Sequence, residues 1–240
     1  DISVDILHED DDLIIVNKGS GMVPHTAVGN YSGTLQNALL FKYPELRDVP
    51  RAGIIHRLDK QTSGLLIIAR TLKAHNNLTK QIQNKLITKK YITITSGILN
   101  NVTVIDQKIG RHKINRKKMS VTDSGKESTS RLKILRRFDK ASLIEVDLVT
   151  GRTHQIRVHL SFIGHPVVGD KLYGFKKSIF SKNTKLVNFL DSYNGHALHA
   201  MSLEFKHPST KEKFFIESPP PDEFLKIQSL IEKHSYADTN

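Results

Sequence analysis

The 240-residue sequence contains no cysteine and no tryptophan, and only 7% of its residues are aromatic. The lack of cysteine excludes disulfide frameworks, thiolate catalysis and iron–sulfur clusters, and it fits a reducing compartment such as the cytoplasm. The few aromatic residues give no support to modules that recognise RNA by stacking bases on a sheet.

Long apolar segments are also lacking. The longest apolar runs, residues 13–16 and 65–69, have the length of strands and fall far short of the ~20 residues of a membrane helix. The N-terminal residues lack the basic and apolar regions of a signal peptide. We therefore expect a cytoplasmic protein without a membrane partner.

The charge of the sequence is strongly unbalanced, with 36 Lys and Arg against 24 Asp and Glu and a net charge of +12. Because unpaired charges are rarely buried, this surplus predicts a basic surface and an anionic partner, with nucleic acid ahead of membranes. Basic residues gather in residues 108–118, 131–140 and 171–185. Each run taken singly fits a solvated face equally well. The first run contains no acidic residue, and we expect it to form a hairpin or loop that faces phosphates.

The pattern of short apolar segments predicts an α+β fold. The sequence has no internal repeat and no long linker, so we expect a single domain over residues 1–240. Strands follow strands through short turns, which favours a central antiparallel or mixed β-sheet with flanking helices and loops. The expected strands are 4–8, 13–17, 53–58, 64–70, 90–97, 126–138, 142–149, 196–207 and 213–217. The expected helices are 34–43, 72–85, 152–163 and 221–234.

The sequence lacks the motifs of several common ligand-binding sites. The glycines at 169 and 174 have the spacing of a phosphate-binding loop, but Phe175 follows where a Lys is needed. No glycine motif for a dinucleotide opens a helix, and no His-Glu-x-x-His zinc motif occurs. These failures predict a protein without a nucleotide cofactor or a metal.

Two segments carry charged residues in an arrangement that local structure alone does not require. In residues 54–68, Asp59 stands between two apolar segments with His56, Arg57 and Lys60 beside it. An ordinary hairpin turn would explain this segment, whereas a functional interpretation makes Asp59 an ionised group for nucleophilic or acid–base work. In residues 150–160, a turn at Gly151 leads into a helix for which Thr153 is the expected cap.

This second segment carries two Arg and two His within eight residues. A solvent-facing amphipathic helix would explain them, but crowding of this kind favours an anionic partner. The four residues are Arg152, His154, Arg157 and His159.

Together the two segments resemble a known family. Residues 56–65, His-Arg-Leu-Asp-Lys-Gln-Thr-Ser-Gly-Leu, resemble the catalytic motif of the RluA-type pseudouridine synthases. Further segments match in the same order over nearly the whole chain: 13–18, 89–91, 110–112, 117–119, 151–160, 164–174 and 198–200. Residues 48–54 are most similar to the RluD-like branch, which acts on large-subunit ribosomal RNA.

The resemblance implies an isomerase that needs no metal or cofactor. The enzyme would break the N1–C1′ bond of uridine in RNA, rotate the uracil and rejoin it through C5. Asp59 matches the essential acid, and the sequence leaves open whether that acid attacks C1′ or removes the 2′ proton. Tyr91 matches the tyrosine that stacks on uracil, Arg157 the basic partner of the acid, and Arg57 the arginine that enters the space of the flipped base. We expect further RNA contacts from His56, Arg152, His154, Arg111, Lys117 and Lys118.

The departures from the family pattern are few. Gly19 and Thr26 replace prolines that are common there, which concerns the rigidity of a loop rather than the chemistry. The N-terminal S4 RNA-binding module of many relatives is absent from this chain, which we expect to be the catalytic domain alone and a monomer. A synthase for tRNA or another RNA, and a non-catalytic RNA-binding or ribosome-assembly factor with the same fold, are the alternatives.

Overall fold

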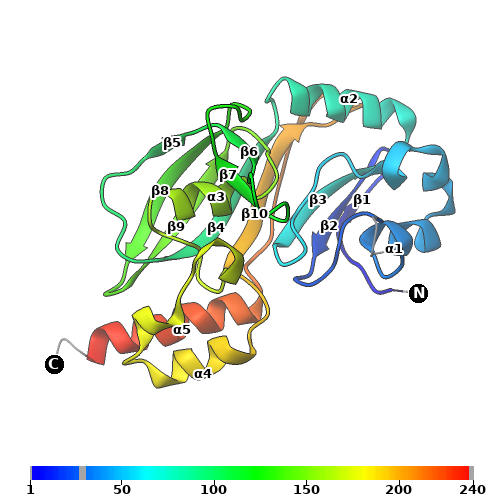
Figure 1. Ribbon diagram of the computed structural model, residues 1–240. Helices are drawn as coiled ribbons and strands as arrows, with labels where there is room; N and C mark the ends of the chain where they lie inside the picture. Colours follow the sequence, from blue (N-terminus) through cyan, green and yellow to red (C-terminus); the bar gives the residue numbers. More distant parts are fainter. Residues whose placement is uncertain (1, 27–30, 238–240) are drawn as a thin grey trace. The chain divides into compact units, whose positions relative to one another are not determined.

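The computed structural model describes residues 2–26 and 31–237, and within it the chain forms two compact units (Figure 1). Unit 1 comprises Asp1–Lys89 and Ala200–Pro219, and unit 2 comprises Lys90–His199 and Pro220–Asn240. The expected single catalytic domain stays a prediction.

Unit 1 is a small sheet covered by helices. Its strands follow the order β1 (Asp5–Glu9), β2 (Leu13–Lys18), β3 (Ser63–Ala69) and β10 (Leu198–Lys206), with β11 (Lys213–Glu217) beside β10. The pairs β1–β2, β2–β3 and β10–β11 are antiparallel. Strands β2 and β3 are almost continuously apolar because both of their faces are covered.

Two helices of unit 1 begin at side-chain caps, of which only Thr71 was predicted from the sequence. Thr34 caps α1 (Leu35–Lys42) in a capping box with Asn37, and the 3₁₀ turns η1 (Pro44–Asp48) and η2 (Pro50–Gly53) follow α1. Thr71 caps α2 (Leu72–Gln83) by accepting a hydrogen bond from the Ala74 N–H. Apolar residues of α2 pack onto the apolar core of β2, β3 and β10.

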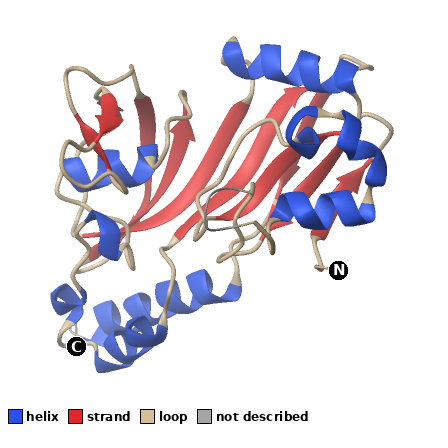
Figure 2. Cartoon of the chain, turned by 45° about the vertical axis from the view of Figure 1, so that its right-hand side comes forward, coloured by secondary structure: helices blue, strands red, loops and turns tan. Residues whose placement is uncertain are grey.

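Unit 2 contains four further strands with antiparallel pairing, drawn in red in Figure 2 like the other strands. Its strand order is β4 (Thr88–Ser96), β9 (Ala141–Leu148), β8 (Thr129–Arg137) and β5 (Val104–Asp106). Helices α4 (Thr184–Ser192) and α5 (Asp222–Ala237) share an apolar core with β4 and β9. The α+β class with a largely antiparallel sheet is confirmed.

A short hairpin and the helix packed against it are further elements of unit 2 that carry candidate site residues. Strands β6 (Ile109–Arg111) and β7 (Met119–Val121) form a separate hairpin, which confirms the hairpin expected for the first basic run. Helix α3 (Gln155–Phe162) packs against this hairpin (Figure 1), and the 3₁₀ turns η3 (Lys171–Tyr173) and η4 (Lys177–Phe180) follow it in the chain.

Three local predictions are wrong. Residues 53–58 form no strand beyond a single bridge from Ile54 to Ile68, because Gly53 has a positive φ of 75° and turns the backbone away. The cap of α3 is His154 in a left-handed conformation rather than Thr153, and Gln155 instead accepts hydrogen bonds from Thr150 and the Arg152 N–H. Helix α4 was not expected, although Asn183 caps it.

Candidate active site

Asp59 lies in the loop that links the Ile54 bridge to β3. The carboxylate is half-buried, and the carbonyl oxygen of Asp59 accepts a hydrogen bond of 3.1 Å from the Thr62 N–H, which closes a turn. Thr62 and Ser63 are buried behind this turn. The loop therefore presents one acidic side chain from a compact backbone.

A buried ammonium group lies beneath this loop. Lys18, at the end of β2, is only 1% exposed, and its Nζ donates hydrogen bonds to the carbonyl oxygens of Gly19 (2.7 Å), Met22 (3.0 Å) and Lys60 (3.1 Å). Burial lowers the pKa of Lys18 to about 7, while the negative charge of Asp59 acts in the opposite direction. Lys18 thus joins two loops and supplies positive potential to Asp59.

Gly64 fixes where the loop enters β3. Its φ is +113°, and a Cβ atom at this position would lie only 2.3 Å from the carbonyl oxygen of Ala200. Glycine is required here both by its backbone conformation and by the close approach of the neighbouring strand.

His56 supports the loop from its other side. The Nε2 atom of its half-buried ring accepts a hydrogen bond of 3.0 Å from the Ile67 N–H in β3. Burial, followed by the positive potential of Lys89 and His25, lowers the pKa of His56 to about 3. The ring is therefore neutral at pH 7 and positions the backbone, while the neighbouring Arg57 is exposed to solvent.

In unit 2, Tyr91 and Arg157 come from a strand and a helix. Tyr91 is buried in β4, opposite Val146 of β9. Arg157 is buried in α3, and its Nε and Nη2 atoms donate hydrogen bonds of 2.6 and 2.9 Å to the two carboxylate oxygens of Asp170. The Arg157 guanidinium also lies 4.8 Å from the ring centre of Tyr173.

The ion pair between Arg157 and Asp170 has a two-pronged geometry that fixes the plane of the guanidinium. Asp170 also accepts a hydrogen bond from the Tyr173 N–H, which begins η3. The expected pairing of Arg157 with Asp59 joins residues of different units and stays a prediction.

The other residues expected to bind RNA lie around α3 and on the β6–β7 hairpin. His154 Nδ1 is 2.7 Å from the Tyr173 hydroxyl, and the Arg152 Nε donates to the Glu127 carbonyl oxygen at 3.2 Å. Arg111 and Lys117 are exposed on the hairpin, whereas Lys118 is half-buried.

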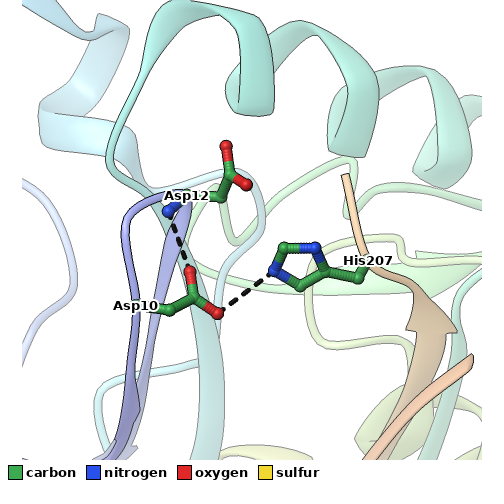
Figure 3. A group of neighbouring side chains, drawn as sticks. All are labelled: Asp10, Asp12 and His207. Carbon is green, nitrogen blue, oxygen red and sulfur yellow. Dashed lines mark hydrogen bonds and ion pairs between the residues drawn. The ribbon is translucent and has the colours of Figure 1, made fainter. Parts of the chain in front are cut away.

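Within the described part of the chain, Asp10, Asp12 and His207 have side-chain atoms close enough to bind one metal ion (Figure 3). His207 Nδ1 accepts from the N–H groups of Ser209 and Thr210, so Nε2 carries the proton and donates to Asp10 Oδ2 at 3.1 Å. A protonated Nε2 has no lone pair for a metal, so the group is better suited to holding the β1–β2 turn against the β10–β11 turn.

Both oxygen atoms of the Asp10 carboxylate have further hydrogen-bond partners. His8 Nε2 lies 2.8 Å from Asp10 Oδ2, while the Asp12 and Leu13 N–H groups bond to Oδ1. Partial burial raises the pKa of Asp10, but these hydrogen bonds outweigh it and lower the pKa to about 2.

Comparison with known proteins identifies the class to which this fold and site belong. The model of the RNA pseudouridylate synthase family matches residues 12–162, which include Asp59, Tyr91 and Arg157. The chain belongs to this family.

Individual relatives have names that belong to the same family. A ribosomal large subunit pseudouridine synthase D of Pseudomonas aeruginosa is 45% identical over 233 residues, covering 96% of this chain and 72% of the relative. The enzyme of the same name from Vibrio parahaemolyticus is 40% identical, covering 97% of this chain and 72% of the relative.

Solved structures have the same fold. Human RNA pseudouridylate synthase domain containing 1 is 27% identical with a TM-score of 0.72, covering 95% of this chain and 87% of that one. Human RNA pseudouridylate synthase domain containing 4 is 22% identical with a TM-score of 0.75, covering 95% and 93%, and supports the fold alone.

Two residues of the candidate site were not predicted as such from the sequence. Lys18 belongs to the family-like segment 13–18 but was given no role from the sequence, although a Lys that directly ends a buried strand is a usable signal. Asp170 lies in the family-like segment 164–174 but was given no role from the sequence, and its partner Arg157 lies 13 residues away in the chain.

Proposed function

We propose that this protein isomerises uridine to pseudouridine in large-subunit ribosomal RNA, with Asp59 as the essential acid. The observation that carries the proposal is the half-buried carboxylate of Asp59 at the family's motif position, in a loop held by the buried Lys18. The names of the relatives support this class of RNA.

Each residue of the site has a separate role that follows from the chemistry of its side chain. Asp59 acts at the ribose while the N1–C1′ bond breaks and uracil turns to offer C5. A C5–C1′ bond then forms, the proton on C5 is lost to water, and N1 takes up a proton from water. Tyr91 provides a ring for uracil to stack on, and Arg157 provides positive charge for the carboxylate. Arg57, exposed on the same loop as Asp59, fills the space of the flipped base.

The proposal extends to the partner and the compartment. The net charge of +12 supports binding of the RNA backbone. None of the helices in residues 2–26 and 31–237 combines the length and apolar character that a membrane crossing requires. We propose a cytoplasmic monomer that uses only its own side chains for the reaction.

Loss of tritium from 5-tritiated uridine tests the reaction, because C5 exchanges its hydrogen for the bond to C1′. Large-subunit ribosomal RNA transcribed with this label should release tritium with the wild-type protein and with the control Asp11→Ala, an exposed aspartate. Asp59→Ala should release none. Release by Asp59→Ala at the wild-type rate would overturn the role of Asp59.

The substrate is tested separately. Pseudouridine mapping in total RNA from a deletion strain should show the loss of sites in large-subunit ribosomal RNA. Loss of sites only in tRNA would contradict the proposed substrate, and a complete set of sites would contradict the enzyme.

A further inference from the structure

The β6–β7 hairpin carries an apolar side chain at its cationic tip. Ile114 is 89% exposed, which is the largest exposure among the big apolar side chains in the described ranges. The exposed cations around it are Arg111, Lys113, Arg116 and Lys117. A single exposed isoleucine is common on protein surfaces, so its exposure alone decides nothing.

The backbone of the tip is unusually well fixed for an exposed loop. The N–H groups of Ile114 and Asn115 both donate to His112 Nδ1, at 3.2 and 3.1 Å. Arg111 donates across the turn to the Arg116 carbonyl oxygen at 2.6 Å. Isoleucine is also stiff at χ1, so little conformational entropy is lost when this side chain inserts into another surface.

Asn115 closes the same turn through both its side chain and its backbone. Its Oδ1 accepts from the Lys117 N–H at 3.1 Å, and its carbonyl oxygen accepts from the Lys118 N–H at 2.9 Å. Ile114 therefore lies exposed in a turn that is closed by hydrogen bonds within the hairpin itself.

The base of the hairpin is joined to the helix that carries Arg157. Ile109 packs with Val158 and Tyr173 in one apolar cluster, and the Met119 N–H donates to the Tyr173 hydroxyl at 2.9 Å. The ring of the same Tyr173 holds the Arg157 guanidinium at 4.8 Å. The tip and the candidate catalytic arginine thus belong to one packed assembly within unit 2.

We propose that Ile114 is a wedge that inserts between stacked bases of the RNA next to the target uridine. Apolar wedges of this kind unstack a base step, and adjacent Lys and Arg side chains neutralise the flanking phosphates. Unstacking is part of the free-energy cost of flipping a nucleotide, so a preformed wedge lowers that cost. The proposal rests on the proposed function. It gives Ile114 a role that differs from that of Arg57, which fills the space left by the flipped base.

The experiment compares two substrates of the same sequence around the modified uridine, once mapping has located it. One is a folded stem-loop and the other is an unstructured oligonucleotide of about 15 nucleotides. Ile114→Ala should lower kcat/KM about ten-fold or more on the stem-loop and less than two-fold on the oligonucleotide. Ile114→Phe keeps a wedge and should retain activity on both. Ile98→Ala, which truncates another exposed isoleucine, should match the wild type.

Binding is read out independently of the chemistry. In the stem-loop with 2-aminopurine beside the uridine, the wild-type protein should raise the fluorescence of the unstacked base, and Ile114→Ala should abolish most of this rise. Equal losses of kcat/KM on both substrates, or an unchanged fluorescence rise with Ile114→Ala, would overturn the wedge. Absence of tritium release by the wild type would instead count against the proposed function, because the fluorescence test needs no turnover.

Discussion

The Nζ atom of Lys18 lies 3.1 Å from the carbonyl oxygen of Lys60, the residue that follows Asp59. The backbone next to the candidate acid is therefore tied to an ammonium group at the end of a buried strand. Two further carbonyl oxygens, from Gly19 and Met22, share the three protons of this group. The arrangement uses every donor of the lysine side chain.

Replacement of Lys18 by Met should reduce both stability and activity. The change keeps the length of the side chain but leaves three carbonyl groups without their donor, and each buried unsatisfied group costs about 1–3 kcal/mol. Relief from burying an ammonium offsets part of this cost, so we expect a loss of about 2–4 kcal/mol in the free energy of unfolding, measured with urea. A displaced Asp59 should lower kcat by about 10- to 100-fold.

Lys60→Met is the matched control for stability, because the Lys60 side chain is exposed and only its backbone takes part in the contact. It should unfold like the wild type. Equal stability of Lys18→Met and the wild type would contradict the bracing role of Lys18.

Asp170→Asn should disrupt the positioning of Arg157. The side chains of this pair are 7% and 2% exposed, and removal of one partner from a buried ion pair costs about 3–5 kcal/mol. We expect a loss of this size in urea unfolding and a lower kcat, because the guanidinium is no longer held in one plane. Arg157→Lys should also lose activity, since an ammonium cannot form the two-pronged contact.

Asp191→Asn provides the comparison for the pair. Asp191 forms an ion pair with Lys177 in which both side chains are about half exposed, so its loss should cost less than about 0.5 kcal/mol. Similar losses for the two variants would show that burial of Arg157 and Asp170 does not matter.

His56 should make the protein sensitive to mild acid. The pKa of His56 is about 3 in the folded protein against an ordinary value of 6.5, so the unfolded chain binds more protons between these two pH values. Stability is therefore complete above pH 6.5 and falls as the pH decreases toward 3. Because the ring is partly exposed, we expect this single group to account for about 1–3 kcal/mol at pH 4.

The stability advantage of the wild type over His56→Gln should shrink by that amount between pH 7 and pH 4, in urea unfolding at each pH. Gln keeps an acceptor for the Ile67 N–H but carries no titratable group. Parallel pH profiles of the two proteins would refute the assignment.

Asp10 should make the stability depend on pH in a lower range than His56 does. Its pKa is about 2 in the folded protein against 3.8, so its contribution is complete above pH 3.8 and is lost as the pH falls through 2. Asp10 is 31% exposed, and we expect Asp10→Asn to cost about 1–2 kcal/mol at pH 7 and almost nothing near pH 2. Added Zn²⁺ should leave the Tm of the wild type unchanged, whereas a rise would show that the Asp10 group binds metal.

Much of the fold could be predicted because local rules and tertiary structure agree. Buried strands such as β2 and β3 are continuous apolar runs, and Thr71 caps its helix as expected. The failures lie where the backbone departs from these rules. Residues 53–58 look like a strand, yet Gly53 has a positive φ, and a Cβ on it would come within 2.0 Å of the Ala69 carbonyl oxygen.

The site was predictable only in part, for a physical reason. Asp59 is conspicuous because a cluster of charged residues interrupts two apolar segments, and Arg157 belongs to a segment crowded with cations. Asp170 has no such local signature, since its importance comes from a contact with α3 that appears only after folding. The left-handed conformation of His154 likewise depends on contacts that the sequence does not display.

Gly64 has a consequence for how freely this protein can vary. At position 64 the main chain itself lies against the neighbouring strand, so that a Cβ atom would come within 2.3 Å of the Ala200 carbonyl oxygen. A single added carbon there would force β3 and β10 apart and carry the acid with them. The placement of the acid is thus encoded in part by the absence of a side chain at position 64.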